Sequence, residues 1–203
     1  MKLYEYEAFP SPRRVRIFLA EKGLDIEREQ VDVPAGAHRQ PDFLARNPDA
    51  TVPCLELDDG SHISESVAIS RYFEERNPSP PLMGSGAESK AVTEMWQRRV
   101  ENGLMNPVGT YYHHATDGLG EPDRYRNRDW GERNRDIAMD TMRVLDARLA
   151  DHDFIAGENF SIVDITALCA LDFAEAVGIS LPQELQHLGR WYTAVSQRDS
   201  AAA

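Results

Sequence analysis

This 203-residue chain has few cysteines, no surplus of positive charge and no long apolar run. Its two cysteines, Cys54 and Cys169, lie in apolar stretches, which argues against a disulfide framework and favours a reducing cytoplasm. The 22 lysines and arginines are outnumbered by 34 aspartates and glutamates, so the net charge of −12 repels phosphate backbones. No apolar stretch approaches the about 20 residues that span a bilayer, and the first residues lack a signal-peptide core. We therefore expect a soluble cytoplasmic protein that binds neither nucleic acid nor membranes.

The first 77 residues alternate strand and helix patterns. A strand at residues 2–6 leads into a helix for which Ser11 is the expected N-cap and Pro12 the first helical residue. The elements that follow are expected as a strand at 26–33, a helix at 41–46, strands at 52–57 and 61–63 around a turn at 58–60, and a helix at 66–76. This order predicts a thioredoxin-like domain whose first two strands are parallel.

Proline-rich residues 77–81 (NPSPP) interrupt this pattern, and only helical periodicity follows. Ser161 and Asp164 form a capping box in front of a helix that is apolar nearly all round and therefore central. Other helices are expected at 88–115, 129–149 and 185–197, with a polar loop at 118–128 and an apolar face formed by Ile137, Thr141, Leu145 and Leu149. The predicted fold class is α/β plus all-α: a thioredoxin-like domain at 1–77, a linker at 78–87 and a helical bundle domain at 88–203.

Residues 47–53 (NPDATVP), together with Glu65 and Ser66, suggest an edge that binds a peptide. A cis peptide bond between Val52 and Pro53 would expose the N–H and C=O of Val52 instead of burying them in a sheet. The helix that follows offers free N–H groups and the positive end of its dipole to a carboxylate. Two explanations without a binding site stay open. Pro53 can be a trans proline at the start of a strand, and Glu65 and Ser66 can simply begin a helix.

Three blocks of the sequence, at residues 11–24, 38–70 and 158–173, resemble the glutathione transferase family. The segment from Ser11 (SPRRVR) is similar to the first-helix signature of serine-type members, in which this hydroxyl donates a hydrogen bond to the glutathione sulfur. The resemblance implies that Ser11 is catalytic, that glutathione is the substrate and that no metal takes part. Ala8, where tyrosine-type members carry tyrosine, argues against their mechanism, and no cysteine before Pro53 is available for cysteine chemistry.

The resemblance also implies how the glutathione backbone is held. Val52 and Pro53 match the family's cis-proline, where the backbone N–H and C=O pair with the cysteinyl part of glutathione as an added strand. Thr51 belongs to the same segment, where many relatives carry glutamine or lysine, so the contribution of its side chain is open.

Both ends of glutathione have implied partners as well. Glu65 would bind the γ-glutamyl amine, and Ser66 would bind the neighbouring carboxylate through its hydroxyl and its N–H group. His38 and Arg39 resemble the His-Lys pair that some serine-type members use on the glycine carboxylate, which a guanidinium can bind with two hydrogen bonds. A solvated His-Arg pair in a loop is the alternative.

The helical domain should line the pocket for the second substrate. Met105, Tyr111 and Tyr112 are the candidates for this electrophile pocket. His113, His114 and Asp117 hint at a metal site, but no further ligand has a suitable spacing.

The resemblance implies a homodimer that conjugates glutathione to a small apolar electrophile, in detoxification or in a metabolic step. Two other functions stay open: a glutathione-binding module without turnover, and a glutathione-dependent disulfide reductase, peroxidase or isomerase. Isomerase relatives usually carry a Ser-Ser-Cys run in the first-helix loop, where this chain has Pro10, Ser11 and Pro12.

Overall fold

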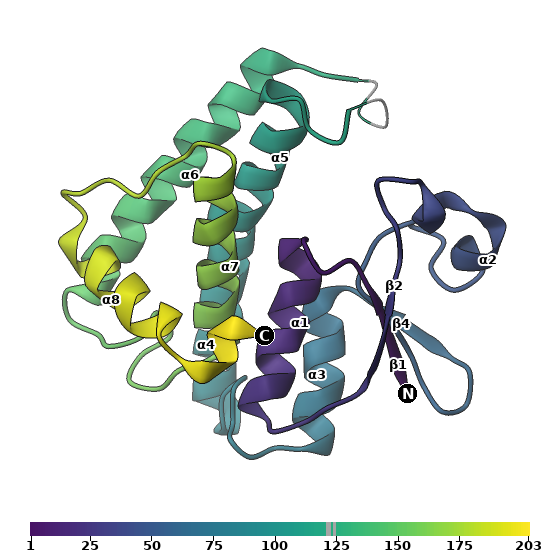
Figure 1. Cartoon of the computed structure of the whole chain (residues 1–203). Coiled ribbons are helices and arrows are strands. Elements are labelled where there is room, and N and C mark those ends of the chain that lie inside the picture. Colours follow the sequence, from purple (N-terminus) through teal and green to yellow (C-terminus); the bar gives the residue numbers. More distant parts are fainter. Residues whose placement is uncertain (121–122, 124) are drawn as a thin grey trace. The chain divides into compact units, whose positions relative to one another are not determined.

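A computed structural model of the protein describes residues 1–120, 123 and 125–203 (Figure 1). The chain divides into two compact units, Met1–Leu82 with Ala202–Ala203, and Met83–Ala201. Part of the expected loop at 118–128, namely residues 121, 122 and 124, lies outside the described residues. None of the described helices combines the length and the hydrophobicity that a membrane-spanning segment needs.

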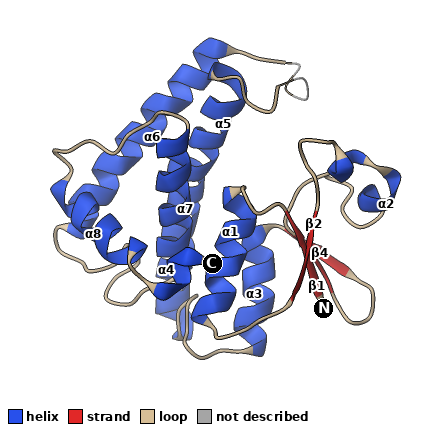
Figure 2. Ribbon diagram, in the orientation of Figure 1, coloured by secondary structure: helices blue, strands red, loops and turns tan. Residues whose placement is uncertain are grey.

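A four-stranded sheet organises the first unit (Figure 2). Its strands are β1 (Lys2–Glu5), β2 (Glu27–Gln30), β3 (Cys54–Glu56) and β4 (His62–Ser64), in the spatial order β2-β1-β3-β4. Strands β1 and β2 are parallel, whereas β3 is antiparallel to both of its neighbours. The predicted thioredoxin-like arrangement is therefore confirmed. Strand β2 is shorter than the predicted 26–33, and all four of its residues are exposed.

Helix α1 (Pro10–Glu21) begins earlier than predicted. Phe9, in extended conformation, is the N-cap, and Pro10 is the first helical residue, so the prediction of Ser11 as N-cap and Pro12 as first residue is wrong. The reason is that either proline suits the start of a helix, because φ is fixed and no N–H is needed there. Ser11 is thus the second residue of the helix, and its hydroxyl is not used as a cap.

Helices α1 and α3 (Ser66–Arg76) pack together, and the structure buries two ion pairs around α1. Arg16 Nη1 lies 2.7 Å from Glu5 Oε2 in β1, and Lys22 Nζ lies 2.6 Å from Glu74 Oε2 in α3. A buried charge is tolerated only with such a partner. The two pairs therefore fix α1 against the sheet and against α3.

A short 3-10 helix at Ala37–Arg39, which the sequence did not predict, precedes α2 (Pro41–Leu44). Helix α2 ends before the predicted residue 46. The turn between β3 and β4 closes with Gly60 at a φ of 81°, a conformation that glycine adopts without steric cost.

The second unit is helical, with α4 (Gly86–Val100), α5 (Asn106–Ala115), α6 (Arg128–Leu149), α7 (Ile162–Ala176) and α8 (Gln186–Ser196). A π-helical segment at Glu101–Met105 joins α4 to α5, so the predicted helix at 88–115 is continuous but not regular. Two features explain the irregularity. Pro107 has no N–H to donate to the carbonyl of Gly103, and Gly103 lies so near α6 that an added Cβ would be 2.5 Å from Thr141 Oγ1.

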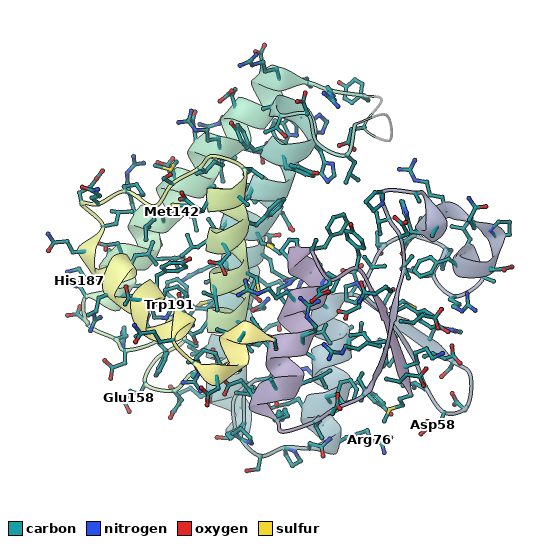
Figure 3. The ribbon with its side chains drawn as sticks, viewed as in Figure 1. Asp58, Arg76, Met142, Glu158, His187 and Trp191 are labelled. Atoms are coloured by element: carbon teal, nitrogen blue, oxygen red, sulfur yellow. The ribbon has the colours of Figure 1, made fainter. Side chains whose placement is uncertain are left out.

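The predicted capping box of α7 is confirmed. Asp164 Oδ2 accepts a hydrogen bond of 3.0 Å from the backbone N–H of Ser161. Asp164 Oδ1 accepts another of 3.0 Å from the indole N–H of Trp191, which Figure 3 labels on α8. Of the predicted apolar face of α6, Leu145 and Leu149 are buried, whereas Ile137 and Thr141 are only half-buried. Ala138 and Met142 are fully buried instead.

Candidate functional site

The Val52–Pro53 peptide bond is cis, as the resemblance implied. The Val52 side chain is 9% exposed and belongs to a core cluster against which Phe9 and Ala37 pack. Within the described part of the chain, no hydrogen bond uses the Val52 N–H or C=O. This turn therefore presents one donor and one acceptor to an extended peptide, next to the segments that begin α1 and contain His38.

Asn47 stabilises this turn through hydrogen bonds, a role that the sequence did not predict. The side chain is 1% exposed, and its Nδ2 donates to the Thr51 carbonyl at 2.8 Å and to Thr51 Oγ1 at 3.0 Å. Asn47 Oδ1 accepts from the N–H of Asp49 at 3.2 Å, an Asx turn that the Asn-Pro-Asp sequence could have indicated. The Thr51 hydroxyl therefore accepts a hydrogen bond within its own loop. A contact between Thr51 and the ligand stays a prediction.

Glu65 has a backbone conformation that is rare for a residue with a side chain. Its φ is 69°, it is the N-cap of α3, and its carboxylate is exposed. Such a conformation costs of the order of 1 kcal/mol and occurs at functional sites more often than elsewhere. The strained backbone and the free N–H groups of the first turn of α3 occupy the place where the glutamyl end of glutathione is expected.

Ser66 is the first residue of α3 and is 3% exposed. Its hydroxyl donates a hydrogen bond of 2.9 Å to the Ser11 carbonyl. Since a hydroxyl has one hydrogen, this bond leaves the Ser66 side chain without a further donor for a ligand. The backbone N–H of Ser66 is the group that remains suited to a carboxylate.

Ser11 is half-buried in the first turn of α1. Its Oγ accepts a hydrogen bond of 3.4 Å from Nη2 of Arg14, one turn further along the helix. No acceptor for the Ser11 O–H hydrogen lies among the residues that the structure describes. The structure therefore brings Ser11 together with Ser66, as predicted residues of one site, and adds Arg14, which the sequence reasoning overlooked.

His38 is buried, with 5% of its surface exposed, whereas Arg39 is exposed. Burial, followed by the positive charge of Arg39, holds the pKa of His38 below its usual value. The imidazole is therefore neutral at neutral pH. Of this pair, Arg39 is the cation that can attract a carboxylate.

The three residues expected in the electrophile pocket lie in the second unit. Met105 is only 6% exposed, while Tyr111 and Tyr112 are half-buried. The Tyr112 hydroxyl donates to the Gly118 carbonyl at 2.8 Å, and its ring packs edge-on against Phe173, with centroids 5.5 Å apart. Met105 is thus mainly a core residue, and Tyr111 offers the least constrained surface of the three.

His113 and His114 do not converge on Asp117. His113 Nδ1 lies 2.8 Å from Asp123 Oδ2, and His114 Nδ1 accepts a hydrogen bond of 3.1 Å from the N–H of Asn127. Among the described residues, no group of three potential ligands could hold a metal ion. The two histidines instead contact Asp123 and Asn127 separately.

Comparisons with known proteins agree with this architecture. Residues 10–76 match the family model of the glutathione S-transferase N-terminal domain, and residues 115–199 match that of the C-terminal domain. The chain is 41% identical over 203 residues to glutathione S-transferase 2 of Saccharomyces cerevisiae, an alignment that covers 98% of this chain and 87% of the relative. It is 32% identical over 192 residues to maleylacetoacetate isomerase of Pseudomonas aeruginosa, which covers 89% of this chain and 84% of the relative.

A solved structure of a glutathione S-transferase domain-containing protein from Marinobacter aquaeolei superposes with a TM-score of 0.97 at 46% identity. The superposition covers 98% of this chain and 99% of the other. With both domain models matched and these identities over nearly the whole length, the chain belongs to the glutathione S-transferase family.

Proposed function

We propose that the protein binds glutathione along the Val52 turn and conjugates it to a small apolar electrophile. The observation that carries this proposal is the unpaired N–H and C=O of Val52 beside a cis proline. The cysteinyl backbone of glutathione pairs with these two groups, as an added strand would. Glu65 then forms an ion pair with the glutamyl amine, and the N–H of Ser66 donates to the adjacent carboxylate. Arg39 binds the glycine carboxylate.

Ser11 is the residue that faces the sulfur in this proposal. Its hydroxyl hydrogen, which has no acceptor among the described residues, donates to the thiolate and favours the charged form. The thiol proton leaves to water, the thiolate attacks the electrophilic carbon, and the leaving group departs as its anion. Tyr111, Tyr112 and Met105 are the residues that we propose to contact the electrophile.

Replacing Ser11 tests this mechanism. Ser11→Ala should lower turnover of a chlorodinitrobenzene-type substrate by about tenfold to a hundredfold and raise the pKa of the bound glutathione thiol, because the hydrogen bond to the thiolate is lost. Ser11→Thr, which keeps a hydroxyl, is the matched control and should retain a large share of the activity. Unchanged turnover in Ser11→Ala would remove Ser11 from the mechanism.

A second candidate function is glutathione-dependent isomerisation. It is favoured by the 32% identity to maleylacetoacetate isomerase of Pseudomonas aeruginosa. The test is to incubate the protein with maleylacetoacetate and glutathione: an isomerase consumes no glutathione, whereas a transferase with an electrophile consumes one molecule per turnover. Binding of glutathione without either reaction, or reduction of mixed disulfides, would instead identify a binding module or a reductase.

We also propose that the protein is a homodimer, on the strength of its family. Light scattering of the purified chain tests this directly. A mass near 22.9 kDa at all concentrations would contradict it, since that is the mass of one chain.

A further inference from the structure

Arg14 lies between two of the residues proposed to bind glutathione. The residue is 9% exposed, and its Nη2 donates to Ser11 Oγ at 3.4 Å and to Ser66 Oγ at 3.3 Å. Both bonds are longer than the usual 2.7–3.2 Å, yet their donor is charged, which strengthens them. A single guanidinium nitrogen therefore joins the first turn of α1 to the first turn of α3.

The directions of these bonds determine what each hydroxyl can still do. Ser66 accepts from Arg14 and gives its own hydrogen to the Ser11 carbonyl, so its donor is used. Ser11 also accepts from Arg14, but its hydrogen has no acceptor among the residues that the structure describes. Because a serine hydroxyl rotates to suit its partners, a cation on one side turns the hydrogen to the other side.

We propose that Arg14 is the positioning residue of this site, which orients the Ser11 hydroxyl as a donor to the glutathione sulfur and couples it to Ser66. The inference rests on the proposed function of Ser11. The guanidinium also places a positive charge, held away from water, near the sulfur. Both effects lower the pKa of the bound thiol.

A double-mutant cycle separates this role from a merely structural one. Arg14→Gln should raise the pKa of bound glutathione, followed by the ultraviolet absorbance of its thiolate, by about one unit and lower kcat/KM about tenfold. In a Ser11→Ala background, Arg14→Gln should have less than about a twofold further effect, since residues that act through one another are not additive. Arg28→Gln, which removes a charge from exposed strand β2, is the control for net charge and should match the parent protein.

Distinct outcomes identify which proposal fails. If Ser11→Ala keeps the parent thiol pKa and activity, the proposed function of Ser11 is wrong. If Ser11→Ala is impaired but Arg14→Gln is not, or if the two effects add fully, only the role of Arg14 is overturned. Should Arg14→Gln fail to fold, Arg14→Lys, which keeps the charge and most of the aliphatic side chain, replaces it in the cycle. A partial loss of kcat/KM that disappears in the Ser11→Ala background supports the proposal. A loss of kcat/KM that adds to that of Ser11→Ala overturns it.

Discussion

The Ser66 hydroxyl donates a hydrogen bond of 2.9 Å to the backbone carbonyl of Ser11, which ties the start of α3 to the start of α1. Two segments 55 residues apart in the chain are thereby held at one place. Each supplies a helix N-terminus, and both dipoles favour negative charge there. The proposed binding of a carboxylate and of a thiolate at this place follows from the same geometry.

Removing this tie should weaken both the fold and the site. Ser66→Ala leaves the Ser11 carbonyl without its donor and Arg14 without one acceptor, at a cost of about 1–3 kcal/mol in the free energy of unfolding. Denaturant unfolding measures this loss. The control is Ser70→Ala, also on α3, whose hydroxyl bonds only the Ser66 carbonyl within the helix. Equal effects of both substitutions on the thiol pKa of bound glutathione would contradict the coupling.

Asn47 provides a test of the turn that presents Val52. Asn47→Ala removes the two bonds to Thr51, so the turn should lose its fixed geometry and glutathione should bind about tenfold more weakly. Calorimetric titration measures the change. Asn134→Ala is the matched control, because this buried asparagine also donates to a carbonyl, that of Trp130, but in the second unit. It should reduce stability and leave the affinity for glutathione unchanged; the reverse result would argue against a role for the turn.

The buried carboxylate of Asp164 should make stability depend on pH. Burial raises its pKa to about 6, from a usual value of 3.8. Since the folded state holds this proton more tightly than the unfolded state, the contribution to stability is complete below about 3.8 and is lost as the pH rises through about 6. Each unit of pKa corresponds to about 1.4 kcal/mol.

Asp164→Asn, whose side chain does not titrate, reveals this dependence by comparison. The substitution should reduce stability at neutral pH, because an amide nitrogen replaces one of two oxygens that accept hydrogen bonds from Ser161, Ile155 and Trp191. The difference between parent and variant, measured by unfolding at several pH values, should grow as the pH falls from 7 to 4. A constant difference would show that Asp164 keeps its usual pKa.

Neither cysteine should react in the folded protein. Burial raises the pKa of the Cys54 thiol to about 11, so roughly one thiol in a thousand is ionised at pH 8. Cys169 is 1% exposed. A thiol reagent should therefore label both residues only after unfolding, as mass spectrometry can count. Rapid labelling of Cys54 in the native protein would reopen cysteine chemistry next to Pro53.

Local patterns predicted the elements well, and contacts between distant segments limited the rest. The capping box of Ser161 and Asp164 followed from neighbouring residues, whereas the cis bond at Pro53 followed from the resemblance to glutathione transferases. The start of α1 was misplaced because Pro10 and Pro12 suit the same helix position equally well.

Other features depend on surroundings that no short segment encodes. The positive φ of Glu65, which lies between β4 and α3, is not signalled by β-strand or helix patterns. The hydrogen bond of Arg14 to Ser66 forms only because the fold brings α3 next to α1, and the two residues are 52 positions apart in the chain. The buried state of His38 likewise arises in the fold, so its neutral form could not be read from the sequence.

Calorimetric titration of the purified protein with glutathione tests whether the Val52 turn and Glu65 bind this tripeptide. We expect saturable binding of one glutathione per chain, weakened about tenfold or more in Glu65→Gln, which removes the charge that pairs with the glutamyl amine. Heat no greater than dilution at millimolar glutathione, or an affinity indifferent to Glu65, would contradict it.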